Sequence, residues 1–126
     1  MINNRTVSSG EKPQQLREQR IYFDMNNGQM QFIMPIINIS SPGLFHIIST
    51  GNILSMNMDL RVLLVNVYQG KRHVLNVSNI VHISGIFSIN TTEYILEGTV
   101  SLFLQKISQS SGNVIIRGSN TSIIRY

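Results

Sequence analysis

Short apolar segments separated by frequent turn signals are the feature that most restricts the fold of this chain. From residue 20 onward, segments rich in Ile, Val, Leu and Phe alternate with Gly, Asn, Ser and Pro clusters, and no convincing helical period occurs. This spacing is typical of strands in a sandwich or barrel rather than of βαβ units. The strands are expected at roughly 20–25, 29–39, 43–49, 53–68, 72–83, 86–90, 93–97, 99–107, 113–117 and 122–126.

The length of the chain, 126 residues, is that of one domain. We therefore predict an all-β fold: a single-domain, antiparallel β-sandwich of jelly-roll-like type with about eight or nine strands. Residues 1–19 are polar and hold few sizeable apolar residues, so they are predicted to form a flexible N-terminal arm. Residues 20–126 are predicted to form the sandwich.

Segment 53–67, ILSMNMDLRVLLVNV, begins as a strand with one apolar and one polar face. Leu54, Met56, Met58, Leu60, Val62 and Leu64 share one parity, which predicts that this face lies in a core. From Leu63 the other parity becomes apolar too, and three further segments, 79–89, 98–107 and 114–118, are also apolar on both faces. A β-bulge at residues 62–63 explains the change there, but not the other two-faced segments.

Outer strand faces of a monomeric sandwich should be polar, and only 13% of this chain is charged, about half the usual share. The two-faced strands therefore predict burial against further copies of the chain, with closed symmetry of low order and a trimer favoured. The residues predicted to mediate self-association are Leu63, Val65, Val67, Phe103, Ile107, Ile115, Ile116, Ile123 and Ile124.

Two local features refine the strand pattern. The triplet Ile-Ile-Arg occurs at 115–117 and again at 123–125 across Gly-Ser-Asn-Thr, which predicts a terminal hairpin. Pro35 lies inside an otherwise regular strand, so that strand is predicted to lie at a sheet edge or to bend there.

The sequence offers no recognisable site for chemistry. It contains no cysteine, no phosphate-binding glycine loop and no nucleophile motif, and its three histidines lack metal-ligand spacing. We therefore predict no catalytic residue, no metal and no cofactor, and a protein that is not an enzyme. Because the start of the chain is polar and no long apolar run occurs, we expect no signal peptide and no membrane insertion.

The net charge of +4 raises the alternative of a basic nucleic-acid-binding β-barrel. The basic residues are scattered, however, and the aromatic residues are spread over many strands rather than interleaved with them. We predict only weak contact with nucleic acid. The candidate residues for polyanion contact are Arg5, Lys12, Arg17, Arg20, Lys71 and Arg72.

A β domain whose strands are apolar on both faces, with a polar arm and no recognisable catalytic or ligand-binding site, is typical of a structural protein. Ile and Asn together make up about a quarter of the chain, a bias that fits the AT-rich genomes common among viruses and phages. We therefore predict a small virion component, such as a capsid decoration, minor capsid or fibre-head protein. It would be made in the host cytoplasm and would contact other virion proteins through residues 1–19.

Overall fold

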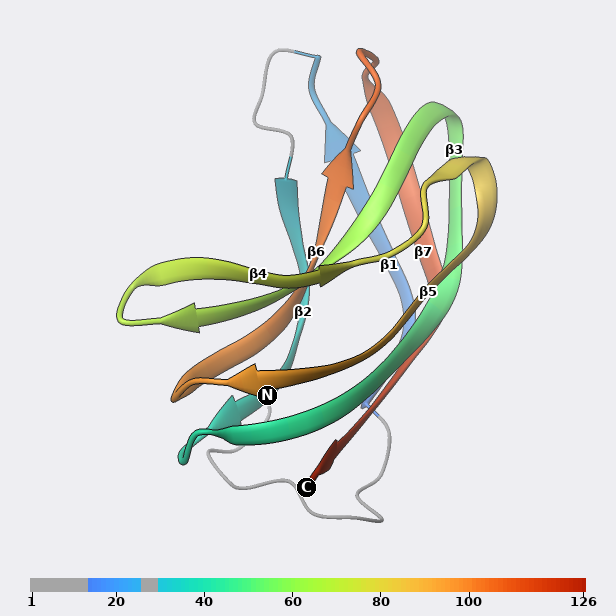
Figure 1. Cartoon of the computed structure of the whole chain (residues 1–126). Coiled ribbons are helices and arrows are strands. Elements are labelled where there is room, and N and C mark those ends of the chain that lie inside the picture. Colours follow the sequence, from blue (N-terminus) through green and yellow to red (C-terminus); the bar gives the residue numbers. More distant parts are fainter. Residues whose placement is uncertain (1–13, 26–29) are drawn as a thin grey trace.

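The computed structural model describes residues 14–25 and 30–126, and any prediction for residues 1–13 or 26–29 lies outside the described residues. The described chain is built from strands (Figure 1). They are β1 (Gln14–Phe23), β2 (Met30–Ile39), β3 (Gly43–Tyr68), β4 (Lys71–Val77), β5 (Val81–Ile95), β6 (Gly98–Lys106) and β7 (Gly112–Arg125).

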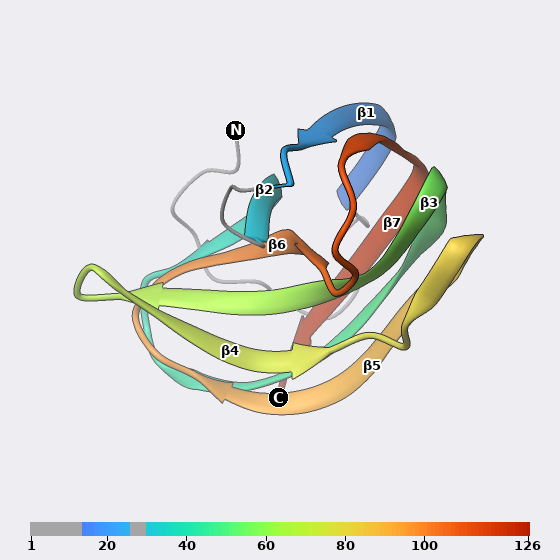
Figure 2. The same cartoon turned by 90° about the horizontal axis from the view of Figure 1, so that it is seen from above.

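All strand pairs are antiparallel, and the strands form one sheet that curls into two layers (Figures 1 and 2). The first layer has the order β1-β7-β3-β5 and uses residues 43–55 of β3. The second has the order β2-β6-β3-β4 and uses residues 60–68 of β3. The predicted all-β sandwich of jelly-roll-like type is confirmed. It has seven strands because several predicted strands merge into β3, β5 and β7.

The space between the layers holds the main hydrophobic core, to which both halves of β3 contribute. Two hydroxyl groups inside it, those of Ser49 and Thr121, bond each other at 2.7 Å. Lys106 is also buried, and its Nζ donates to the carbonyls of Asp24 and Ser110 at 3.0 and 2.7 Å. The largest fully buried side chains are those of Phe23, Phe45, Phe87, Ile36, Ile47, Ile53, Met58, Leu60, Leu64, Ile89, Ile95 and Leu102.

Strand β3 changes its inward parity where it passes from one layer to the other. Odd residues up to Ser55 face the core, whereas even residues from Met58 onward do so. Ser55 accepts from the Met58 amide at 3.2 Å, and the register with β5 is shifted between Leu54 and Asp59. The prediction that every even residue from 54 to 64 faces the core was therefore wrong for the first two. Leu54 is 45% exposed, and Met56, which lies at this irregularity, is 89% exposed.

The second apolar face of β3 is covered within the chain itself. Leu63, Val65 and Phe103 form a small separate cluster on the outer side of the second layer, each at most 5% exposed. Their prediction as residues exposed for self-association was wrong, because side chains of neighbouring strands bury them. The described residues that pack on this cluster are Met30, Phe32, Val67 and Arg72.

The predicted terminal hairpin is a single strand, β7, with an irregularity at its centre. Gly118 has a positive φ of 59°, and the register with β3 shifts opposite Gly51. The inward parity changes there, so that Ile116 and Ile123 both lie in the main core. Their predicted outer position was wrong, because the Gly-Ser-Asn-Thr segment forms a bulge between two long neighbouring strands rather than a turn.

The structure places the start of the first strand earlier than predicted. β1 begins at Gln14, so residues 14–19 of the predicted arm pair with β7, and the boundary at residue 20 was wrong. Apolar and polar residues alternate only weakly in residues 14–19, because β1 is an edge strand of the sheet. Pro35 is correctly predicted: β2 is the opposite edge strand and its register with β6 shifts on both sides of this residue.

We expect Gly51→Ala to lower the free energy of unfolding by about 1–3 kcal/mol, because overpacking a core costs this much. A Cβ at this position would lie 2.5 Å from a ring carbon of Phe87 and 3.1 Å from the Cα of Ser119. Gly85→Ala is the matched control, since its Cβ would meet only the Val81 side chain, at 3.3 Å. Urea denaturation of both variants checks the prediction, and equal stabilities would contradict it.

Candidate interaction surface

The acidic and histidine side chains do not converge on a reaction centre. Asp59 pairs with the exposed ring of His82, and Glu93 accepts from Thr91 at 2.5 Å and Asn76 at 3.4 Å. Within residues 14–25 and 30–126, no group of three or more His, Asp or Glu side chains could hold a metal ion. The surface that stands out is apolar instead.

Each strand from β7 to β5 contributes apolar side chains to the outer face of the first layer, between polar residues such as His46 and Thr50. Even residues of β3 up to Leu54 point outward, and the register places Leu44 beside Tyr94, Asn52 beside Ile86, and Leu54 beside Ile115. Ile86 and Tyr94 are 63% and 61% exposed. We call the following residues the outer apolar face: Leu44, Ile48, Leu54, Ile86, Tyr94, Ile115 and Ile124.

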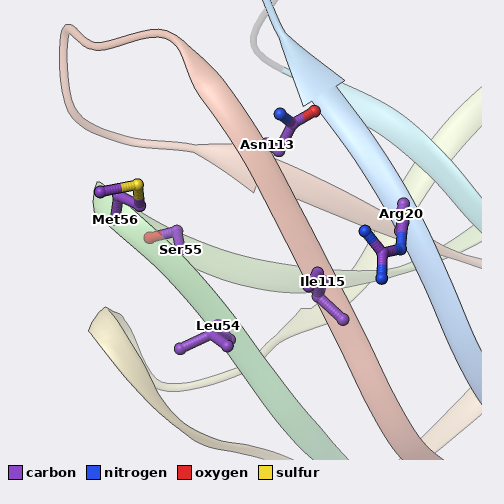
Figure 3. Close-up of a pocket in the computed structure, with 6 residues that line it drawn as sticks. All are labelled: Arg20, Leu54, Ser55, Met56, Asn113 and Ile115. Atoms are coloured by element: carbon purple, nitrogen blue, oxygen red, sulfur yellow. The ribbon is translucent and has the colours of Figure 1, made fainter.

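Two adjoining hollows mark one end of this face, with volumes of about 340 and 460 Å³. Both are lined by Leu54 and Ile115, one extending to Arg20 and Met56 and the other to Arg117. Figure 3 shows the first hollow, with Leu54 on β3, Ile115 on β7 and Arg20 on β1. The arrangement is an apolar floor flanked by two guanidinium groups, which suits contact with another macromolecular surface.

One carboxylate and two guanidinium groups form an ion-pair array beside the hollows. Arg20 Nε donates to Glu18 Oε2 at 3.2 Å, and Arg117 Nε donates to Glu18 Oε1 at 3.1 Å. The hydrogen bond from Arg20, together with the charge of Arg117, holds the pKa of Glu18 below its ordinary value. Because the array is exposed, it contributes little to stability.

Four predicted self-association residues have partly or largely exposed side chains, and they do not form one patch. Ile115 and Ile124 belong to the outer apolar face, where their prediction stands. Ile107 is exposed at the end of β6. Val67 is partly buried against the small cluster of the second layer.

The six residues predicted to contact polyanions do not gather on one surface in the described part of the chain. Arg17 and Arg20 lie on β1, Lys71 and Arg72 at the tip of the β3–β4 hairpin, and Arg5 and Lys12 outside the described residues. Arg72 lies over the ring of Phe103, 4.8 Å from its centroid. The hairpin extends away from β1 in both views (Figures 1 and 2).

Most of the outer apolar face was missed by sequence reasoning. Leu44, Ile48 and Tyr94 lie on strands in which polar residues separate the outward apolar ones, and Ile86 lies in segment 79–89, which was predicted to be apolar on both faces but was not named for self-association. Leu54 was predicted to face the core because it shares the parity of Leu60, but the irregularity between them turns Leu54 outward. Asn57 between two methionines marked the place where the parity changes.

Comparison with known proteins identifies the fold but no family: no family model and no curated protein matches the sequence. A chain in the structure of infectious bursal disease virus, Gx strain, superposes with a TM-score of 0.55 at 10% identity, over 98% of this chain and 38% of that one. This chain therefore spans well under half of the viral chain, and at this identity the likeness shows the fold alone.

Two further solved structures resemble the chain less closely. Murine APRIL gives a TM-score of 0.48 at 12% identity, over 64% of this chain and 68% of that one. The C-terminal CBM6 of LamC, a laminarinase from Zobellia galactanivorans, gives 0.39 at 16% identity, over 92% and 96%. Within the described ranges, the structure has no helix that is long and apolar enough to cross a membrane.

We expect Arg20→Gln to raise the pKa of Glu18 toward its ordinary value, because the strongest hydrogen bond to the carboxylate is lost. In the parent, ionised Glu18 stabilises the fold above its ordinary pKa, and this contribution is lost as the pH falls through the lowered pKa. Titration of the Glu18 carboxyl carbon by NMR measures both values. Arg17→Gln is the matched control, and an equal shift in both variants would contradict the assignment.

Proposed function

We propose that this protein is a non-enzymatic structural protein that assembles with further copies of itself through the outer apolar face. The observation that carries the proposal is the group of exposed apolar side chains on the outside of the first layer, such as Ile48, Ile86 and Tyr94. The outer face of an antiparallel sandwich is ordinarily polar. A large exposed apolar patch on a monomer marks an interaction site.

We further propose that the assembly is part of a virus or phage particle, as a capsid decoration, minor capsid or fibre-head protein. The fold similarity to a chain of the bursal disease virus structure supports this placement, as does the bias toward Ile and Asn. Three-fold symmetry is the preferred closed arrangement, because a closed oligomer covers the outer face of every copy. The part of the predicted arm that precedes β1, residues 1–13, would contact neighbouring virion proteins.

Light scattering behind a sizing column, at low and high salt, tests the assembly. We expect a closed oligomer, a trimer by preference, in both conditions, because burial of apolar surface does not weaken as salt rises. A monomer in both conditions would overturn the proposal. An oligomer that forms only with added nucleic acid and dissociates at high salt would favour the nucleic-acid-binding alternative.

We expect the double variant Leu54→Asn, Ile86→Asn to weaken assembly about 30-fold, because it removes about 2 kcal/mol of apolar burial from each contact. Both side chains are at least 45% exposed, so the fold itself should persist, which circular dichroism checks. The control is Val74→Asn on β4, a side chain that is 53% exposed outside this face. Equal masses for the two variants in light scattering would show that the face is not the contact.

A further inference from the structure

Four strands form sheet edges in the described residues, β1 and β5 in the first layer and β2 and β4 in the second, and β1 offers a regular edge that pairs with a strand on one side only. The edge of β5 is occupied where Asn79 bonds the Ile86 carbonyl and the Ser88 amide, at 2.9 Å each. The edge of β2 carries Pro35 and two register shifts. β1 has no proline and keeps a constant register with β7 over its whole length. Natural proteins protect edge strands because an open edge pairs with other strands.

We propose that two copies of this chain join edge to edge through β1, antiparallel and about a two-fold axis at Gln19. The first layers of the two copies then form one continuous sheet. Glu18 of each copy lies opposite Arg20 of the other. This contact deepens the proposed self-association and rests on it, but it uses a different surface from the outer apolar face, so trimers closed through that face would pair into a hexamer.

The direction of the main-chain groups supports this pairing. The Tyr22 carbonyl accepts a hydrogen bond from Gln31 Nε2 of β2 at 2.6 Å, so it points away from β7. Main-chain groups alternate along a strand, so those of Glu18 and Arg20 also point to the open edge. A residue pair of this kind exchanges both of its main-chain hydrogen bonds. The two symmetric Glu18–Arg20 pairs therefore complete the contact without displacing Gln31.

The charges select the register. The side chains of Glu18 and Arg20 share one face of β1 and are 40% and 71% exposed. The neighbouring registers that keep the same main-chain hydrogen bonds would place Arg20 opposite Arg20, or Glu18 opposite Glu18. Like charges directly opposite each other destabilise a strand pair, whereas opposite charges stabilise it. The register centred on Gln19 places unlike charges opposite each other at both positions.

A cysteine at the axis tests the contact directly, because the natural chain has none. In the proposed pairing the two Gln19 residues form a non-hydrogen-bonded pair with a Cα separation of about 4.5 Å, which a disulfide spans. We expect Gln19→Cys to form a disulfide-linked dimer under mild oxidation, at least ten-fold faster than Gln15→Cys. The two Gln15 positions would lie about 25 Å apart along the strands. Equal rates for the two variants would overturn the contact.

Charge exchange tests the register. In the Gln19→Cys background, Arg20→Glu and Glu18→Arg should each slow crosslinking at least ten-fold, because each places like charges opposite each other. A mixture of the two variants should restore it as a heterodimer, in which every opposed pair is again unlike. Arg17→Glu changes the net charge equally and should leave crosslinking unchanged. Unchanged crosslinking in Arg20→Glu, or no restoration in the mixture, would overturn the register.

The two proposals fail in distinguishable ways. A parent oligomer whose Gln19→Cys variant does not crosslink would overturn the β1 contact and leave assembly through the outer apolar face in place. A parent whose mass is unaffected by Leu54→Asn, Ile86→Asn, but whose Gln19→Cys variant crosslinks, would support the β1 contact and overturn the role of that face.

Discussion

The parity change of β3 between Ser55 and Met58 is the constraint on which the rest of the structure depends. One continuous strand serves both layers, so its inward side chains must change parity where the sheet turns over. The Ser55 hydroxyl fixes this step, since it accepts from the Met58 amide and lies 3.1 Å from the Ile83 carbonyl. The main core can then receive Ile53 from one half of β3 and Leu60 from the other.

The same step creates the candidate surface. An uninterrupted alternation from Leu60 back along β3 would have buried Leu54 and Met56 and turned Ile53 outward. With the parity changed, Leu54 lies outside with Ile115 beside it and forms the floor of both hollows. The outward position of Leu54 is therefore a direct consequence of how the sheet turns over.

The strand content, the antiparallel class and the edge position of Pro35 could be predicted because they depend on local turn chemistry and on the period of apolar residues. The burial of Leu63, Val65 and Phe103 could not, because it depends on side chains from β2 and β4, two other strands. The bulge at Gly118 was read as a turn because a bulge and a turn use the same residue types, and only pairing with β1 and β3 distinguishes them.

Three charged side chains form an exposed array beside the edge of β1. Glu18, Arg20 and Arg117 lie between the outer apolar face and the edge of β1, so one array borders both surfaces. The array holds two guanidinium groups for one carboxylate, which leaves positive charge that a second carboxylate can approach. In the two-fold pairing, that carboxylate is Glu18 of the other copy. In the proposed assembly, burial of the outer apolar face provides affinity, and the array selects the edge strand that pairs and the register of that pairing.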